Sequence, residues 1–351
     1  MQMIQNIDTL DFSVLVDSYD VYIKALHKKL REAKNHSLGG AGNAVIVLAG
    51  VSWEVYPYSN RRYIYILHNE MAELRLCDSW QETDSHYPIF VRLKSYALWR
   101  FGYLKAYQNF MEYLSKLFII SDTKISRLDI ATQVNKKIDI DIDIGAETVS
   151  RTKFRHQWFS DGVCTGYQFG KGDVLLRIYD KIKEIEVSKK FWFADVWDAE
   201  KFEIERGVWN VEFQLRREFL RDWDIDTVED AFKELKNLYS YLTRKWFRVV
   251  EKQLLDINVT RRETSEWWQE IQEKQNGIDE KPKKENKKVK PSTEHLIACI
   301  TGYLISIGAV DDLEIDDLMI RVKKGLEENL EKKMTTYQMA KNERRSLYVK
   351  I

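Results

Sequence analysis

Three polar side chains in this chain have the types and spacing that phosphoryl chemistry requires. Tyr179 lies between two cations, Arg177 and Lys181, in a segment that otherwise alternates with apolar residues. Asp129 and Glu212 stand in two further segments of the same alternating kind. Two carboxylates are hard oxygen ligands for Mg²⁺ or Mn²⁺. A tyrosine beside a divalent metal and cations suits nucleophilic attack on phosphorus, so the pattern predicts a metal-dependent nucleophile site.

A plainer interpretation of these residues stands beside this one. Charged residues along one face of a strand usually face solvent, and a tyrosine in a strand usually packs against its neighbours. The alternation of residue types alone does not choose between a solvated face and a reactive site.

Three β-strands are expected to position these side chains, because side chains alternate across a strand. Residues 165–184 (TGYQFGKGDVLLRIYDKIKE) predict a β-hairpin around a Gly-Lys-Gly-Asp turn, and residues 126–132 (SRLDIAT) and 209–216 (WNVEFQLR) predict two further strands. The residues that share a polar face are Arg177, Tyr179 and Lys181 on the first, Arg127 and Asp129 on the second, and Glu212 and Arg216 on the third. If the three strands lie in one sheet, their polar faces bring the tyrosine and the two carboxylates together.

At these residues the sequence resembles the Rep_trans family, which comprises rolling-circle plasmid replication initiators and related relaxases of integrative elements. The matching segments, in family order, are RLDIA at 127–131, GYQFGKGDVLLRIYDK at 166–181 and VEFQLR at 211–216. The opening IDTLDFSV at 7–14 is similar to the first strand of the family. The resemblance covers roughly the first two-thirds of the chain and departs from the family pattern at Asp180.

The resemblance implies an enzyme that nicks one DNA strand at a replication origin and later rejoins it. Tyr179 would attack the scissile phosphate and keep the 5′ end as a phosphotyrosine, while Asp129 and Glu212 would hold Mg²⁺ or Mn²⁺. Arg177 or Lys181 would lower the pKa of the tyrosine or neutralise the phosphate. A third metal-binding carboxylate, Glu54, is expected from an N-terminal strand.

The resemblance also implies partners. Origin DNA is expected in two forms, a duplex that is bound by sequence and a single-stranded loop that is cut, together with a homodimer and a host helicase. Two other functions stay open: a conjugative relaxase with the same chemistry, and a DNA-binding copy-control protein that does not cut.

Charge and hydropathy limit the functions that this chain supports. The 351 residues contain 55 Lys and Arg and 55 Asp and Glu, and the zero net charge argues against non-specific coating of nucleic acid. A local basic groove remains compatible with this balance, and the candidate DNA-binding residues are Arg127, Arg216, Arg244, Lys245 and Arg248. No apolar run reaches the ~18 residues that a membrane span needs. The first residues lack a secretory pattern, so a cytoplasmic protein without a membrane partner is predicted.

The order of predicted elements indicates an α+β fold, with one or more mainly antiparallel sheets and helices packed on one face. Residues 1–95 are expected to form an N-terminal unit that completes one nicking domain with a catalytic unit at 96–260. A charged, basic linker at 261–291 and a small helical C-terminal domain at 292–351 should follow.

Four further segments carry predictions. Residues 99–117 and 230–255 are each expected to form one long helix, and the second is rich in Lys and Arg that favour contacts with phosphates. The aromatic run at 191–197 suits either stacking of DNA bases or a core. The alternating Ile and Asp at 136–147 suit either a second cation site or an acidic edge strand.

Overall fold

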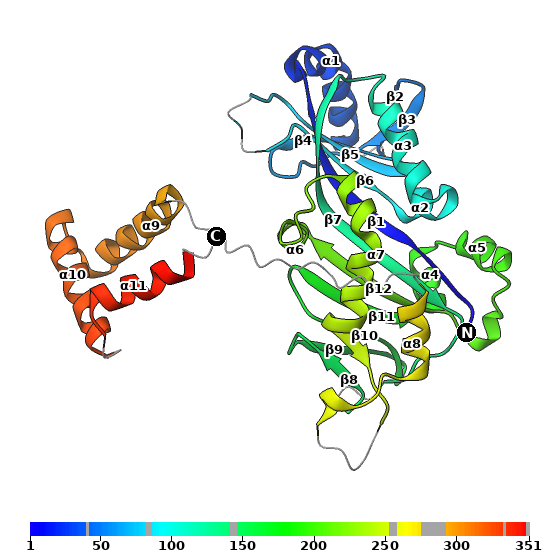
Figure 1. Ribbon diagram of the computed structural model, residues 1–351. Helices are drawn as coiled ribbons and strands as arrows, with labels where there is room; N and C mark the ends of the chain where they lie inside the picture. The colour runs from blue at the N-terminus through cyan, green and yellow to red at the C-terminus, as the bar shows by residue number, and fades with distance from the viewer. Residues whose placement is uncertain are drawn as a thin grey trace. The chain divides into compact units, whose positions relative to one another are not determined.

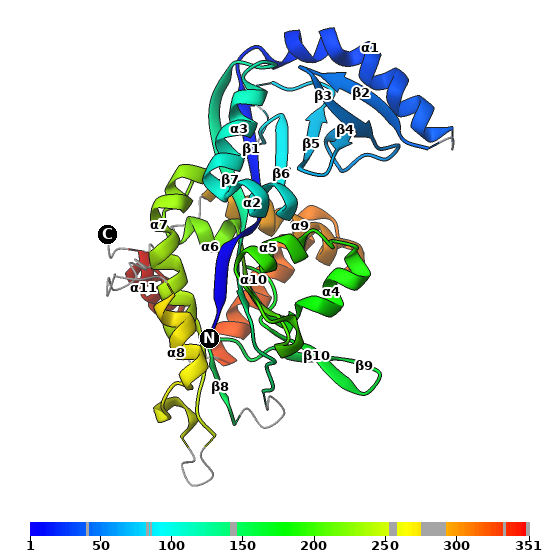
Figure 2. The ribbon, with the colours of Figure 1, turned by 90° about the vertical axis from the view of Figure 1, so that its right-hand side faces the viewer.

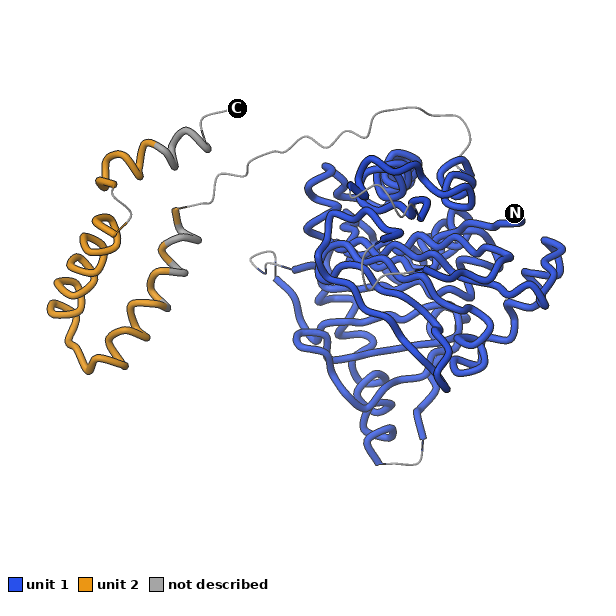
Figure 3. The backbone as a smooth tube through the Cα atoms, turned by 90° about the horizontal axis from the view of Figure 1, so that it is seen from below, with its two compact units in different colours: residues 1–284 blue, residues 285–351 orange. Residues whose placement is uncertain are grey.

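The chain divides into two compact units, residues 1–284 and 285–351 (Figure 3). The computed structural model describes residues 1–39, 42–81, 84, 86–140, 146–252, 258–274, 293–332 and 335–348.

The first unit is built on one eleven-stranded sheet, in which every neighbouring pair is antiparallel (Figure 1). Its strands in spatial order are β2 (Ala44–Leu48), β3 (Val51–Val55), β4 (Tyr63–His68), β5 (Ala72–Cys77), β6 (Ile89–Leu93), β1 (Met3–Val16), β7 (Ile120–Val134), β12 (Trp209–Arg216), β11 (Val174–Asp180), β10 (Val163–Phe169) and β9 (Arg155–Ser160). A separate two-stranded sheet pairs β8 (Thr148–Ser150) with β13 (Phe247–Val249).

Strands β1 and β7 are the longest in the sheet, at 14 and 15 residues, and they hold its two halves together. β1 pairs with β6 on one side and with β7 on the other. The two half-sheets outlined by the sequence therefore form one continuous sheet, and residues 1–95 share their hydrogen bonding with the residues that follow.

The helices of the first unit are α1 (Tyr19–Leu38), α2 (Ser95–Phe101), α3 (Tyr103–Leu114), α4 (Lys181–Ser188), α5 (Phe193–Ala199), α6 (Arg217–Arg221), α7 (Val228–Tyr241) and α8 (Glu266–Glu273). Short helical turns occur at η1 (Ile204–Arg206), η2 (Leu242–Trp246) and η3 (Val259–Arg261).

The two faces of the sheet have different coverings, because side chains alternate along each strand. Ile130 and Phe213 point to the main core, where they meet Leu238 of α7. A smaller core on the opposite face joins Ala131 with Phe193 and Trp197 of α5. Figure 2 shows α7 and α8 on one side of the sheet and α4 and α5 on the other. The predicted α+β class with a mainly antiparallel sheet is confirmed, and α4 and α5 add partial cover to the second face.

Both long helices expected from the sequence are shorter in the structure. The first is divided between α2 and α3 at Gly102, whose φ of 78° is outside the helical region. The second ends at Tyr241, and the chain passes through a π-helical turn into β13, where Phe247 is buried. Burial of the aromatic residues beyond 241 outweighs the helical periodicity there.

The expected linker also begins later than residue 261. Residues 266–273 form α8, and its Trp268 is fully buried and donates a hydrogen bond from Nε1 to the carbonyl of Thr243 at 2.9 Å. The segment is rich in charged residues, but Trp268 and Ile271 form one apolar face of α8 that is buried. Residues 275–292, which contain the lysine-rich part of the linker, lie outside the described residues.

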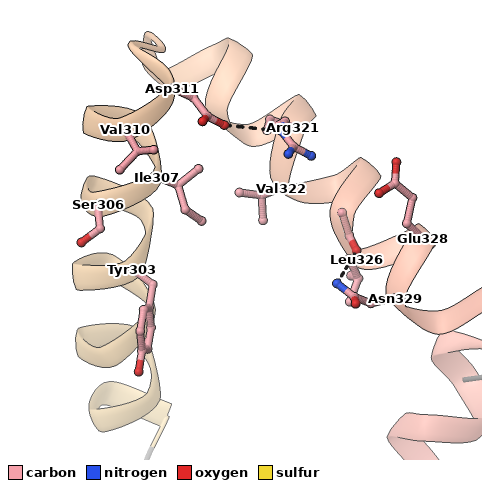
Figure 4. Close-up of a pocket in the computed structure, with 11 residues that line it drawn as sticks. Tyr303, Ser306, Ile307, Val310, Asp311, Arg321, Val322, Leu326, Glu328 and Asn329 are labelled. Atoms are coloured by element: carbon pink, nitrogen blue, oxygen red, sulfur yellow. Dashed lines mark hydrogen bonds and ion pairs between the residues drawn. The ribbon is translucent and has the colours of Figure 1, made fainter. Parts of the chain in front are cut away.

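The second unit contains α9 (Thr293–Asp311), α10 (Ile315–Lys332) and α11 (Tyr337–Tyr348). A groove of about 670 Å³ lies between α9 and α10, and Ile307 and Val322 are among the side chains that line it (Figure 4). Asp311 and Arg321 form an ion pair at 3.5 Å beside it. The helical C-terminal region agrees with the predicted fold class.

Candidate active site

The strand register places the tyrosine, the arginine and the two carboxylates on one face of the sheet. β12 lies between β11 and β7, with Arg177 opposite Glu212 and Asp129 opposite Gln214. Directly opposed residues of antiparallel strands point to the same side. The structure therefore brings together the residues that the three sequence segments predict as a group.

Tyr179 is hydrogen-bonded to two side chains of the neighbouring strand. Its hydroxyl donates to Glu212 Oε2 at 2.8 Å and accepts from Asn210 Nδ2 at 2.8 Å. Asn210 also donates to Glu212 Oε2 at 3.1 Å, so the phenol, the amide and the carboxylate form a closed triangle. This geometry fixes the direction of the hydroxyl and gives its proton an acceptor.

The environment of Tyr179 raises the pKa of the phenol well above its usual value. Burial is the largest cause, followed by the negative charges of Glu212 and Asp8. The net shift is therefore opposite to the lowering expected from Arg177 or Lys181, and the alternative role of these cations, neutralisation of the phosphate, stays a prediction. The phenol is protonated at neutral pH, and its reaction as a nucleophile requires a group that removes the proton.

Arg177 bridges the two carboxylates. One of its terminal nitrogens, Nη2, lies 2.6 Å from Glu212 Oε1 and 4.0 Å from Asp129 Oδ2. Its Nε–H is buried and has no hydrogen-bond partner among the described residues. The guanidinium thus retains a donor that a ligand oxygen can satisfy.

Asp129 is fully buried and paired with Arg127 through both carboxylate oxygens. Burial raises the pKa of Asp129 to about 7, and the hydrogen bond from Arg127 opposes this effect. The carboxyl group therefore changes its charge near neutral pH.

The sequence predicts Lys181 on the polar face of the strand, but Lys181 lies just beyond the end of the strand. The strand ends at Asp180, whose carboxylate accepts hydrogen bonds from the backbone N–H groups of residues 182 and 183 and thereby caps α4. Lys181 begins that helix, is 1% exposed, and pairs with Glu184 at 2.7 Å. Its ammonium lies 5.6 Å from the centre of the Tyr179 ring.

Asp8 is a site residue that the sequence patterns did not single out. It lies on β1 at an irregularity of the register between Ile7 and Thr9, is 7% exposed, and accepts a hydrogen bond from Trp99 Nε1 at 2.8 Å. Burial raises the pKa of Asp8, and Lys181 opposes this shift. A β-bulge redirects side chains in a way that strict alternation does not predict.

Glu54 does not belong to this site. It lies on β3, within 3.1 Å of His68 Nε2, and β3 is six strands from β12 in the sheet order. At ~4.8 Å per strand, that separation is about 29 Å. The prediction that Glu54 supplies a third metal ligand is wrong, and Asp8 is the third carboxylate that the fold provides near Glu212.

The oxygen donors of this site suit a hard divalent cation. Within the described part of the chain, no group of three His, Cys, Asp or Glu side chains is arranged to hold a metal ion. Asp129 and Glu212 supply two carboxylates that flank one guanidinium nitrogen. Mg²⁺ is often held by one or two carboxylates, with water and substrate phosphate as the other ligands. The donor types thus fit Mg²⁺ or Mn²⁺ at Asp129 and Glu212, provided that Arg127 and Arg177, which now pair with these carboxylates, move aside.

The five candidate DNA-binding residues are on two sides of the sheet. Arg127 lines the site, and Arg216 is exposed at the end of β12, opposite Arg127 in the register. Arg244, Lys245 and Arg248 follow α7, on the side of the main core. Arg248 donates hydrogen bonds to the backbone carbonyls of residues 260 and 262. Because α7 ends at Tyr241, the expected cationic helix face does not form.

The structure describes the aromatic run at 191–197 and part of the acidic insert at 136–147. Phe193 and Trp197 are buried in the smaller core, which favours the structural role for the aromatic run. In the acidic insert, residues 137–140 have no strand structure, and the hydroxyl of Tyr167 donates to Asp139 at 3.3 Å. Asp141 and Asp143 lie outside the described residues.

A cleft of about 560 Å³ opens above Tyr179. One wall carries Trp158 and Ser160 of the β9–β10 hairpin, and the other carries Lys183 of α4 and Lys190. Asp8, Asp129, Arg177 and Glu212 also line it. Figure 2 shows the hairpin projecting from the sheet below α4.

No family model and no curated protein matches this sequence, so the resemblance to the Rep_trans family stays a prediction. One similar solved structure is that of a rolling circle replication initiator protein from Geobacillus stearothermophilus. The two sequences are 14% identical, the match covers 78% of this chain and 96% of that chain, and the TM-score is 0.45. This likeness is too distant to transfer a fold family or a function.

None of the described helices has the length and apolar character needed to cross a membrane.

Proposed function

We propose that this chain is a metal-dependent, site- and strand-specific DNA nicking-closing enzyme of the rolling-circle initiator type. The observation that carries the proposal is the hydrogen bond from the Tyr179 hydroxyl to Glu212, at 2.8 Å, in a cleft that Arg177 and Arg127 also line. A nucleophile with an adjacent base and nearby cations is the constellation that covalent phosphoryl transfer requires. The resemblance of the three strand motifs to Rep_trans proteins supports the same assignment.

The reaction follows from the contacts of Tyr179. As its oxygen forms a bond to the scissile phosphorus, the phenolic proton passes to Glu212 Oε2. The bond from phosphorus to the 3′ oxygen breaks, and that oxygen takes a proton from solvent water and leaves as a free 3′ hydroxyl. The 5′ end stays on Tyr179 as a phosphodiester, which conserves the bond for later rejoining.

Arg177 and Asp129 would position and neutralise the phosphate. The guanidinium of Arg177, whose side chain is 33% exposed, would donate to a non-bridging oxygen, and its positive charge would offset the charge that develops there. Asp129 holds Arg127 in the cleft. A divalent cation held by Asp129 and Glu212 would supply Lewis-acid polarisation of the phosphate.

The substrate and partners of the proposal come from the resemblance. They are origin DNA in duplex and single-stranded form, a second copy of the chain and a host helicase. A conjugative relaxase would use the same chemistry on a transfer origin, and the DNA target distinguishes the two.

A competing function is binding of DNA without cleavage. The observation that favours it is that Arg127 and Arg177 already occupy both carboxylates. Incubation with a pool of negatively supercoiled plasmids and Mn²⁺ separates the two functions. Conversion of supercoiled to open-circular DNA by the wild type, and not by Tyr179→Phe, is expected, whereas binding without conversion would favour the competing function.

A further inference from the structure

One row of the sheet runs from the tyrosine to an indole. Tyr179 of β11 is directly opposite Gly166 of β10, and Gly166 is directly opposite Trp158 of β9. All three residues therefore point to the cleft side of the sheet, and two strand spacings, about 9.6 Å, separate the backbones of Tyr179 and Trp158.

The glycine in this row is required by the close approach of its neighbours. A Cβ atom at Gly166 would lie 2.9 Å from Tyr179 Cβ and 3.0 Å from Cε3 of Trp158. The indole therefore rests against the backbone of Gly166, and no side chain stands between it and the tyrosine.

Trp158 differs from the packed tryptophans of this unit. Trp80, Trp192 and Trp267 are also partly exposed, but each packs against a hydrophobic core, whereas Trp158 belongs to neither core and lines the cleft. An indole outside both cores and beside a reactive group is placed to contact a ligand. Across the cleft, Lys183 supplies positive charge, and Lys190 lies 3.5 Å from Glu184, which also lines the cleft.

We propose that Trp158 stacks against the base of an unpaired nucleotide next to the scissile phosphate, so that the cleft takes single-stranded DNA. This inference rests on the proposed function. A base in a duplex is already paired and stacked, while an unpaired base offers a free face to an indole. Lys183 and Lys190 contact the phosphates of the same strand from the opposite wall. Trp158 thereby acts as a positioning residue for the reaction of Tyr179.

The test uses the full chain with Tyr179→Phe, so that cleavage does not disturb binding. The probe is a pool of random-sequence single-stranded oligonucleotides with 5-iodouracil in place of thymine. Irradiation followed by mass spectrometry is expected to identify a cross-link on the peptide that contains Trp158. Cross-links confined to other peptides would overturn the inference.

Affinity measurements with variants complete the test. Trp158→Ala is expected to weaken binding of the same pool by about tenfold to a hundredfold, the range for loss of one base–aromatic stack. Trp158→Phe should restore most of the affinity. Phe159→Ala is the matched control, because Phe159 is the next residue of β9, is 62% exposed, and points to the other face. Equal losses for Trp158→Ala and Phe159→Ala, or no loss for either, would contradict stacking.

Adduct formation by chains that retain Tyr179 separates this inference from the proposed function. Wild-type adducts together with unchanged single-strand affinity in Trp158→Ala would leave the nicking function and remove the stacking role. Single-strand binding that depends on Trp158, without any adduct from the wild type, would keep the stacking role and remove the nicking function.

Discussion

At the scale of single residues, the chemistry depends on where the proton of Tyr179 goes. The sequence predicts the residue types and the strand face, because alternation is a property of any strand. It does not predict that Glu212 accepts the hydrogen bond from the phenol, which makes the carboxylate a candidate base as well as a metal ligand. It also misjudges the pKa of the phenol, because burial and two carboxylates outweigh the nearby cations.

Replacement of Glu212 by Gln tests the role of the carboxylate as a base. The amide keeps a hydrogen-bond acceptor at the same position but does not take up the proton. We expect adduct formation to slow by about 10²–10⁴-fold, the usual contribution of a general base. Glu73→Gln is the matched control, since Glu73 lies in the same sheet and pairs with Arg75 at 2.5 Å. An unchanged rate in Glu212→Gln would exclude this role.

The pKa of Asp129 gives a prediction for stability. Its value in the folded chain, about 7, is above the ordinary 3.8. Protonated Asp129 therefore adds to the free energy of unfolding at low pH, and this contribution is lost as the pH rises towards 7. Asn does not titrate, so the melting temperature of Asp129→Asn, relative to wild type, should rise by several degrees between pH 5 and pH 8. An unchanged difference over this interval would show that Asp129 is ionised in both the folded and the unfolded chain, with a pKa that Arg127 holds at or below its ordinary value.

At the scale of elements, the parts that follow strict periodicity were predictable and the parts that break it were not. The strands at β7, β11 and β12 follow from alternation, and the turn before β11 follows from its glycines. The bulge at Asp8 and the π-helical turn after α7 depend on tertiary contacts, whereas the cap at Asp180 is a local signal that the strand alternation concealed. The bulge and the cap decide which charged residues reach the cleft.

Gly166→Ala tests the close packing of β9, β10 and β11. The added Cβ has no room beside Tyr179 and Trp158, so the strands or the two side chains must shift. Overpacking of this kind costs about 1–3 kcal/mol of the free energy of unfolding. We expect a lower melting temperature and slower adduct formation. Gly325→Ala is the control, because nothing lies within 4 Å of a Cβ there. Equal behaviour of the two variants would refute the close approach.

At the scale of the whole molecule, the first unit is built on one continuous sheet. Both hydrophobic cores draw only on residues up to 271, and β1 pairs with strands on both sides of the expected boundary near residue 95. The sequence outlines two half-domains because their elements follow each other in a similar order. It does not show that one N-terminal strand completes both halves.

Removal of the second unit tests the independence of the first. A chain of residues 1–284 should keep the melting temperature of the full-length first unit and form adducts at a similar rate, because its cores are complete. A chain that begins at residue 96 should fail to fold, since it lacks β1 and the strands beyond it. A soluble, cooperatively folded 96–284 fragment would show that the sheet is divisible after all.

The most direct test of the central claim is the covalent adduct itself. A labelled library of single-stranded oligonucleotides is incubated with Mn²⁺ and either wild-type protein or Tyr179→Phe. We expect an SDS-resistant protein–DNA adduct from the wild type, with the nucleotide attached to the peptide that contains Tyr179, and no adduct from a Tyr179→Phe chain that still binds DNA. An adduct of equal yield from Tyr179→Phe, or one attached to another residue, would contradict it.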